Sequence, residues 1–180
     1  MTTCIALLRG VNVGGHHRLP MHELKGLLER NGCLDVRTYV QSGNAVFRSP
    51  LSDPTRVAKA LAAAVAKSRG FEPRVFVLTR RELERAVVGN PFPEAGESPK
   101  SLHLFFLADM PKQPDTTALD ALKAKTERYV LEARVFYLHT PAGFGTSRLA
   151  GKVERLLGVD ATARNWRTVT TLLEMAKAAG

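Results

Sequence analysis

The sequence is poor in cysteine and contains no long hydrophobic run. Its two cysteines, Cys4 and Cys33, stand in apolar surroundings and lack the close pairing of a metal or redox motif. We therefore expect two reduced thiols and no bound metal. No stretch of about 18 consecutive apolar residues occurs, and the apolar run that begins at Cys4 is interrupted by Arg9 before it reaches the length of a signal-peptide core. These absences exclude a membrane-spanning helix, imply no export and predict a cytoplasmic protein.

Acidic residues are also scarce relative to basic ones. The 180 residues include 17 acidic and 26 basic side chains, which gives a net charge of +9, so an anionic partner is the first hypothesis to consider. The first acidic residue in the chain is Glu23. The remaining composition, 44% hydrophobic and 24% charged, excludes a fibrous or disordered protein. The length suits one large domain or two small ones.

The order of predicted elements repeats along the chain. Apolar spacing and turn residues predict strands over 5–8, 35–41, 44–48 and 74–78, helices over 20–31, 55–68 and 81–88, and a tight hairpin at Ser42-Gly43. The second half repeats the order with strands over 102–107, 129–138 (a hairpin turning near Glu132-Ala133) and 160–163, and helices over 116–125, 146–157 and 166–178. Both halves therefore have the order βαββαβ.

This repetition predicts an α+β fold of two ferredoxin-like subdomains related by structural duplication. The predicted subdomains are residues 1–89 and residues 101–180, the latter with the terminal helix, and a Pro- and Gly-containing segment, 90–100, connects them. The strands over 4–8 and 102–107 are almost entirely apolar, so both faces of each sheet should be covered, with one face packed against the opposite half. A covered sheet counts against binding in the manner of an RNA-recognition motif.

The first loop carries the strongest functional signal. Residues 9–18 combine arginines, histidines and a glycine pair just before a helix start, and in this fold the loop lies beside the turn between the second and third strands. Glycines, a helix N-terminus and guanidinium groups together are what an oxyanion site needs. The simpler interpretation is a structural turn with solvated charges. The candidate ligand-binding residues are Arg9, Asn12, Gly14, Gly15, His16, Arg18, Gln41, Ser42 and Asn44.

The same loop differs from the familiar cofactor motifs. It lacks the Gly-Lys-Ser/Thr ending of a P-loop and the glycine spacing of a dinucleotide fingerprint, so no ATP or NAD cofactor is expected. His16 and His17 are adjacent, which makes them a poor pair of metal ligands. Either histidine is a candidate general acid or base, and this leaves open whether the protein is an enzyme.

Two further segments provide secondary candidates. The loop 139–148 enters a predicted helix that Thr146 or Ser147 would cap, and Asn165 would cap the terminal helix. Capping alone is the simpler interpretation of these residues. Arg164 and Arg167 would extend a basic face, and Trp166 would pack as an anchor. The secondary candidates are Ser147, Arg148, Arg164, Asn165 and Trp166.

Three motifs together resemble a bacterial family called domain of unknown function 1697. They are residues 6–16 (ALLRGVNVGGH), 37–47 (RTYVQSGNAVF) and 162–169 (TARNWRTV). The resemblance implies two ferredoxin-like subdomains and no established activity. Members often carry Asn or Lys where this chain has His17, and Ser-Lys where it has Ser147-Arg148. A role for a specific lysine is therefore not carried over to this chain.

Three functional hypotheses follow from these observations. The leading one is a module that binds a phosphate-bearing partner, either nucleic acid or a nucleotide, at the basic glycine-containing loop. The alternative is an enzyme that acts on a small anionic substrate, with a loop histidine as general acid or base. The third is a structural protein whose basic surface serves solubility. The sequence does not determine the oligomeric state.

Overall fold

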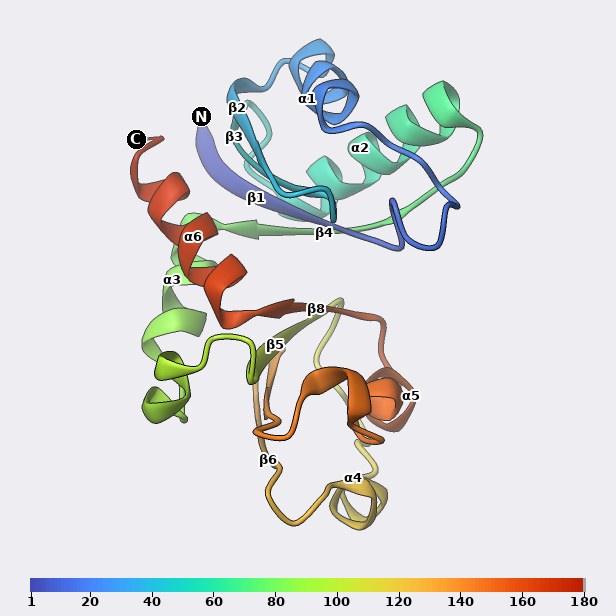
Figure 1. Ribbon diagram of the computed structural model, residues 1–180. Coiled ribbons are helices and arrows are strands. Elements are labelled where there is room, and N and C mark those ends of the chain that lie inside the picture. The colour runs from blue at the N-terminus through green and yellow to red at the C-terminus, as the bar shows by residue number, and fades with distance from the viewer. Residues whose placement is uncertain (180) are drawn as a thin grey trace. The chain divides into compact units, whose positions relative to one another are not determined.

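The computed structural model describes residues 1–179 (Figure 1). In these residues the protein is a mixed α/β structure with two four-stranded antiparallel sheets and six α-helices. The chain forms two compact units, which we call unit 1 and unit 2. Unit 1 comprises Met1–Arg85 with the C-terminal segment from Thr171 on, and unit 2 comprises Ala86–Thr170.

Unit 1 has the element order that the sequence predicts. Its elements are β1 (Thr2–Arg9), α1 (Met21–Arg30), β2 (Leu34–Tyr39), β3 (Asn44–Ser49), α2 (Pro54–Arg69) and β4 (Arg74–Thr79). The strand order across the sheet is β2-β3-β1-β4, so β2 and β4 are the edge strands. The helix α3 (Arg80–Val88) follows β4 directly and continues into unit 2.

Local signals explain where the helices of unit 1 begin and end. The Asp53 side chain accepts a hydrogen bond from Thr55 N–H at 2.9 Å, and Pro54 occupies the first position of α2. Gly70 ends the same helix in the left-handed conformation, with φ +76°. The predicted helices over 20–31 and 55–68 are confirmed.

Both faces of the strand β1 are buried. Cys4, Ala6 and Leu8 belong to a core with the apolar positions of α1 and α2, which cover one face of the sheet (Figure 1). Ile5 and Leu7 point to the opposite face and are fully buried as well. This confirms the expectation from the apolar sequence of the strand that neither face is open to water. Burial raises the pKa of the Cys4 thiol to about 11.

Unit 2 repeats the strand order of unit 1. Its regular elements are β5 (Leu102–Leu107), α4 (Thr116–Leu122), β6 (Arg128–Glu132), β7 (Val135–His139), α5 (Val153–Leu157) and β8 (Ala161–Asn165). The order across the sheet is β6-β7-β5-β8. Short 3-10 turns lie at Pro93–Glu97, Phe144–Thr146 and Ala150–Lys152, and the last helix, α6 (Trp166–Lys177), begins in unit 2 and ends in unit 1.

Two predicted helices of unit 2 are shorter than expected. The prediction over 146–157 is wrong in its first half, because Ser147 is extended (ψ 119°) and Gly151 lies in a 3-10 turn, so α5 begins only at Val153. The predicted helix over 116–125 ends at Leu122. There the chain turns instead, because the carboxylate of Glu127 accepts a hydrogen bond from Ala124 N–H at 2.9 Å.

A half-buried histidine lies on β5. The His103 ring stacks on Phe144 with centroids 3.7 Å apart, and its Nδ1 is buried without a hydrogen-bond partner among residues 1–179. Burial lowers the pKa of His103 to about 4, so the imidazole is neutral at physiological pH. His103 is therefore a packing residue at neutral pH.

None of the helices in residues 1–179 is long and apolar enough to cross a membrane. Both cysteines are buried and neither forms a disulfide. Across the same residues, no group of three or more His, Cys, Asp and Glu side chains is arranged to hold a metal ion.

Candidate functional site

Strand direction brings the predicted site residues to one edge of the unit 1 sheet. Because β1 is antiparallel to β3 and β4, and β2 is antiparallel to β3, the strands β1 and β2 end where β3 and β4 begin. The loop that leaves β1 starts at this edge (Figure 1). We call residues 9–19 and 39–44 together the loop edge. The expected convergence of these two segments is therefore observed.

Asn12 joins the two segments of the loop edge. Its Nδ2 donates to the carbonyl oxygens of Leu19 and Gln41, both at 2.8 Å, and its Oδ1 accepts from Leu19 N–H at 2.8 Å. Its backbone has φ +56°, which asparagine tolerates better than most residues. The carboxamide therefore positions the loop. The sequence predicted that Asn12 contacts a ligand, whereas the hydrogen bonds of its side chain are made within the protein.

The glycine pair forms the tip of a short finger, residues 12–17. His16 N–H donates to Val13 carbonyl oxygen at 3.1 Å, and the intervening Gly14 and Gly15 have φ +59° and +78°. Positive φ at both central residues is the pattern of a type I′ hairpin turn, which glycine adopts without strain. Both glycines are exposed, and Val13 beside them is 65% exposed. The finger thus projects from the sheet.

The two histidines of the finger have different roles. The His17 ring stacks on Phe71 with centroids 4.5 Å apart, and its Nδ1 lies 3.3 Å from the carbonyl oxygen of Gly10. These contacts fix the base of the finger. His16 is exposed next to the glycine pair. His17 is exposed as well, so the two candidate acid-base residues differ in that the His17 ring is held by Phe71 and Gly10.

Arg18 and the start of α1 lie at the base of the finger. The Arg18 side chain is exposed, while its carbonyl oxygen accepts a hydrogen bond from Arg69 Nε at 3.0 Å. Arg69 also forms an ion pair with Glu23 at 3.3 Å, and the Glu23 carboxylate accepts from Ser68 Oγ at 2.6 Å. The helix α1 follows Pro20 without a side-chain cap. Glu23 is thus engaged by α2, and the α1 start has only backbone N–H groups to offer.

The turn between β2 and β3 is longer than predicted. The last paired residues are Tyr39 and Asn44, so four residues form the turn and the predicted two-residue hairpin at Ser42-Gly43 is wrong. The buried Asn44 closes this turn, because its Nδ2 donates to Tyr39 carbonyl oxygen and to Ser42 Oγ, both at 3.0 Å. Val40 enters the turn with φ +49° and is 49% exposed, an uncommon conformation for a β-branched residue.

Gly43 is the point where the two segments touch most closely. It has φ +81°, and its carbonyl oxygen accepts from Leu8 N–H at 2.8 Å. A Cβ at this position would lie 2.6 Å from Val11 Cγ2 and 2.9 Å from Leu8 Cβ. No side chain fits there, so glycine is needed for both its backbone and its lack of volume.

Arg9 lies at the end of β1, directly opposite Arg74 of β4. Both are exposed, and each has an interaction partner within the protein. Sequence reasoning missed Arg37 and Tyr39, which occupy the same edge on β2. The available signal was the alternation of that strand, which places residues two apart on one face.

The secondary candidates of unit 2 have local roles. Asn165 Oδ1 accepts from Thr168 N–H at 2.9 Å, which confirms the expected cap of the terminal helix. Ser147 Oγ accepts from Ala150 N–H at 3.0 Å at a 3-10 turn, so the helix start that it was expected to cap is not there. Trp166 begins α6 and is half-buried, and Arg148 is exposed.

Arg164 does not extend an exposed basic face, contrary to expectation. It is buried, and its guanidinium donates to Thr162 Oγ1 and Ala163 carbonyl oxygen, both at 2.8 Å. Burial lowers the pKa of Arg164 to about 10. It lies on β8, where it pairs with Leu104 of β5.

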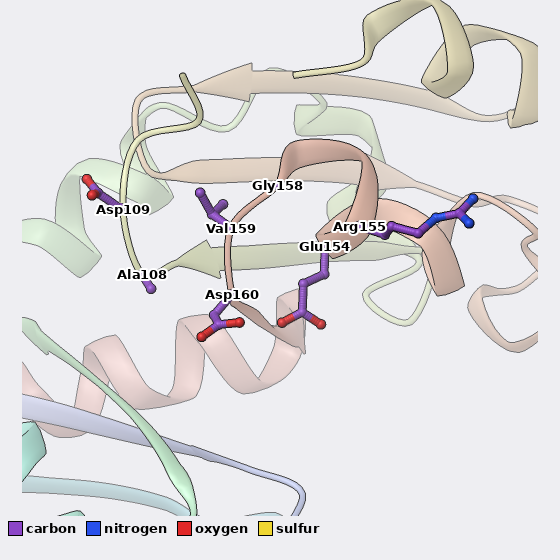
Figure 2. A pocket seen from close by; sticks show the side chains of 7 residues that line it. All are labelled: Ala108, Asp109, Glu154, Arg155, Gly158, Val159 and Asp160. Carbon is purple, nitrogen blue, oxygen red and sulfur yellow. The ribbon is translucent and has the colours of Figure 1, made fainter. Parts of the chain in front are cut away.

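Unit 2 also contains an open hollow of about 490 Å³ that sequence reasoning did not indicate (Figure 2). Figure 2 shows Glu154 and Asp160 pointing to the same side, whereas Asp109 and Arg155 point away from them. Glu154 accepts from Ala161 N–H at 3.3 Å, and both Glu154 and Asp160 have further partners within the protein. The carboxylates of this hollow therefore do not converge on a ligand position. The hollow is lined by Ala108, Asp109, Glu154, Arg155, Gly158, Val159 and Asp160.

Comparisons with known proteins give a similar solved structure and a matching family model. A conserved bacterial protein of solved structure, SP0830 from Streptococcus pneumoniae, aligns with a TM-score of 0.74 and 22% identity over 97% of this chain and 98% of that one. At this identity the likeness shows the fold alone. A search of curated proteins finds no match. Residues 1–137 match the family model described as "Protein of unknown function (DUF1697)", and the chain therefore belongs to this family, as its three motifs suggested.

Proposed function

We propose that the loop edge binds a phosphate-bearing ligand, either nucleic acid or a nucleotide. The observation that carries the proposal is the finger itself: Asn12 fixes its base with three hydrogen bonds, while its tip presents Gly14, Gly15 and His16 to solvent. A loop that is already ordered loses little conformational entropy on binding. Exposed glycines allow a ligand oxygen to approach the backbone closely.

The charges around the finger favour an anion. Arg18 is exposed, and within residues 1–179 no carboxylate pairs with its guanidinium. The nearest acidic residue in the sequence, Glu23, is held by Arg69 and Ser68. The start of α1, which lacks a side-chain cap, adds the positive end of a helix dipole beside Leu19. An incoming phosphate would therefore meet donors and positive charge at the base of the finger.

We further infer that the two units are ferredoxin-like subdomains that arose by duplication. The support is the shared element order and the shared strand order, β2-β3-β1-β4 in unit 1 and β6-β7-β5-β8 in unit 2. The limits proposed for the subdomains remain 1–89 and 101–180 with the connection 90–100. The compact units differ from these limits in that the segment from Thr171 on groups with unit 1.

The alternative function, an enzyme acting on a small anionic substrate, depends on His16. Both histidines are exposed, but the His17 ring is held by Phe71 and Gly10, so the His16 imidazole beside the glycine pair is the one taken to transfer a proton. Turnover that is lost in His16→Ala and kept in His17→Gln, with ligand binding unchanged in both, is the result that would favour this alternative.

Fluorescence anisotropy with a labelled 12-nucleotide single strand at low salt tests the binding proposal. We expect the His16→Ala/Arg18→Ala variant to bind about tenfold or more weakly. The matched control is Arg56→Ala/Lys59→Ala, which removes two exposed basic side chains of α2 and should change the affinity less than about twofold. A loss in the control as large as that in His16→Ala/Arg18→Ala, or larger, would show that only net charge matters, because the control removes two positive charges and the test variant removes one. The absence of binding at low salt would refute the proposal for nucleic acid.

Nucleotides and inorganic polyphosphate are tested by thermal shift on the same proteins. A ligand present at about a hundredfold over its dissociation constant should stabilise the wild type by roughly 2.7 kcal/mol. This stabilisation should be smaller in the His16→Ala/Arg18→Ala variant and unchanged in the control. An identical shift in all three proteins would place the ligand elsewhere on the chain.

A further inference from the structure

The three tyrosines of the chain differ in how the protein uses them. Tyr129 donates its hydroxyl to Asp120 at 2.7 Å, and its ring is part of an aromatic stack in unit 2. Tyr137 is fully buried and donates to the carbonyl oxygen of Ala86 at 2.8 Å. Tyr39 is half-buried at the end of β2, and within residues 1–179 its side chain has neither a hydrogen-bond partner nor a ring partner. Contacts within the protein therefore explain the presence of Tyr129 and Tyr137 but not that of Tyr39.

Arg37 lies beside Tyr39 on the same face of the strand. The two residues are two positions apart in a regular part of β2, opposite Val46 and Asn44 of β3, so their side chains project in the same direction about 7 Å apart. Arg37 is exposed, and no carboxylate among residues 1–179 pairs with it. Because β2 is an edge strand, a ligand can approach this pair from the side of the sheet.

The neighbouring residues limit the size of this surface. In the same row across the sheet, Asn44 and Leu7 are fully buried, so the face that carries Tyr39 is open only at its rim. Beyond Tyr39 the chain turns at Val40, whose positive φ ends the strand and exposes its side chain. The turn then meets Asn12 through Gln41, which joins this surface to the finger. There is room for one aromatic platform, in contrast to the open sheet of an RNA-recognition motif.

We propose that Tyr39 stacks on a nucleobase of single-stranded nucleic acid while Arg37 contacts an adjacent phosphate. This inference rests on the proposed function and narrows its ligand from any phosphate-bearing molecule to one that carries bases. An accessible aromatic ring next to a cation is the combination that binds single strands, because the ring stacks on any base and the cation follows the backbone. The charges of Arg37 and Arg18 match the polyanionic strand.

An abasic 12-nucleotide strand provides the test, because it carries the same phosphates as a 12-nucleotide thymidine strand without the bases. We expect the wild type to bind the thymidine strand about 5- to 150-fold more tightly than the abasic strand, which is the range of one stacked base. Tyr39→Ala should abolish that preference and leave abasic binding unchanged, whereas Tyr39→Phe should keep it. Leu34→Ala, an exposed apolar residue at the other end of β2, is the control and should behave as wild type.

The outcomes separate this inference from the proposal on which it rests. Equal affinity of the wild type for both strands, or a base preference that survives Tyr39→Ala, overturns the platform and leaves phosphate binding in place. Failure of both strands to bind overturns this inference together with the nucleic-acid form of the proposed function, and the thermal-shift experiment then decides the nucleotide form. Thermal unfolding of each variant shows whether it folds. If Tyr39→Ala does not fold, the test rests on Tyr39→Phe, which keeps the ring: loss of the base preference in this variant would overturn the platform.

Discussion

Replacing Gly43 by alanine should destabilise unit 1 far more than the same change at a glycine with open surroundings. A non-glycine residue near φ +81° carries a backbone penalty of about 1–2 kcal/mol. The new methyl group would also lie 2.6 Å from Val11 Cγ2 and 2.9 Å from Leu8 Cβ, both in the buried core, and such overpacking costs roughly 1–3 kcal/mol. The expected total is about 2–5 kcal/mol.

The matched control for this experiment is Gly70→Ala. Gly70 has nearly the same φ, +76°, but nothing lies within 4 Å of a Cβ placed on it. It should therefore lose only the backbone penalty, about 1–2 kcal/mol. Urea unfolding followed by circular dichroism measures both variants, and an unchanged m-value would show that the difference lies in stability. The difference between the two variants isolates the steric contribution.

The Val11→Ala background tests the steric explanation directly. Removing Cγ2 of Val11 takes away the atom nearest to the new methyl group, so Gly43→Ala should cost less in this background than in the wild type. Equal losses for Gly43→Ala and Gly70→Ala, together with no coupling to Val11, would refute the argument that the two segments of the loop edge need a glycine for close packing.

Further predictions concern four other positions. Asn12→Ala removes three hydrogen bonds and should cost about 2–4 kcal/mol by urea unfolding, with a parallel loss of strand binding. Val40→Asn should stabilise the protein by about 0.5–1 kcal/mol, because asparagine tolerates positive φ; a loss of stability would show that Val40 packs usefully. The pKa of His103 is about 4 in the folded protein and near 6.5 when unfolded, so the unfolded chain binds a proton first as the pH falls. The free energy of unfolding should therefore be constant with respect to this group above pH 6.5 and decrease as the pH falls toward 4. His103→Leu should flatten this part of the stability profile. Cys4, buried and with a raised pKa, should react with a thiol reagent only on unfolding, and rapid labelling of the native protein would contradict its placement.

Sequence patterns predicted the parts of the fold that local signals determine. The cap at Asp53 marks the start of α2, and the apolar spacing marks its buried face. The apolar segment 4–8 of β1 correctly indicated burial on both faces. Each of these signals lies within a few residues of the structure it specifies, which is why single-sequence reasoning reads them.

The parts that escaped prediction depend on residues far apart in the chain. The hydrogen bond from Asn12 to Gln41 spans 29 positions, and no pattern in either segment predicts it. The turn length at Val40 depends on the Asn44 side chain, and the burial of Arg164 depends on its place in the sheet of unit 2. Sequence reasoning thus found the location of the loop edge but assigned to ligand contact a residue, Asn12, whose polar atoms bind the protein itself.

The bonding of Asn12 has a consequence for the motion of this edge. One carboxamide connects the finger, the segment at Leu19 that leads into α1 and the β2–β3 turn, so these three segments cannot open independently while its bonds persist. They should form a single cooperative unit whose amide hydrogens exchange with one common opening free energy. A partner that binds the finger would then also reduce the fluctuations of the β2–β3 turn, and a partner that binds the turn would reduce those of the finger, although the two loops are distant in sequence.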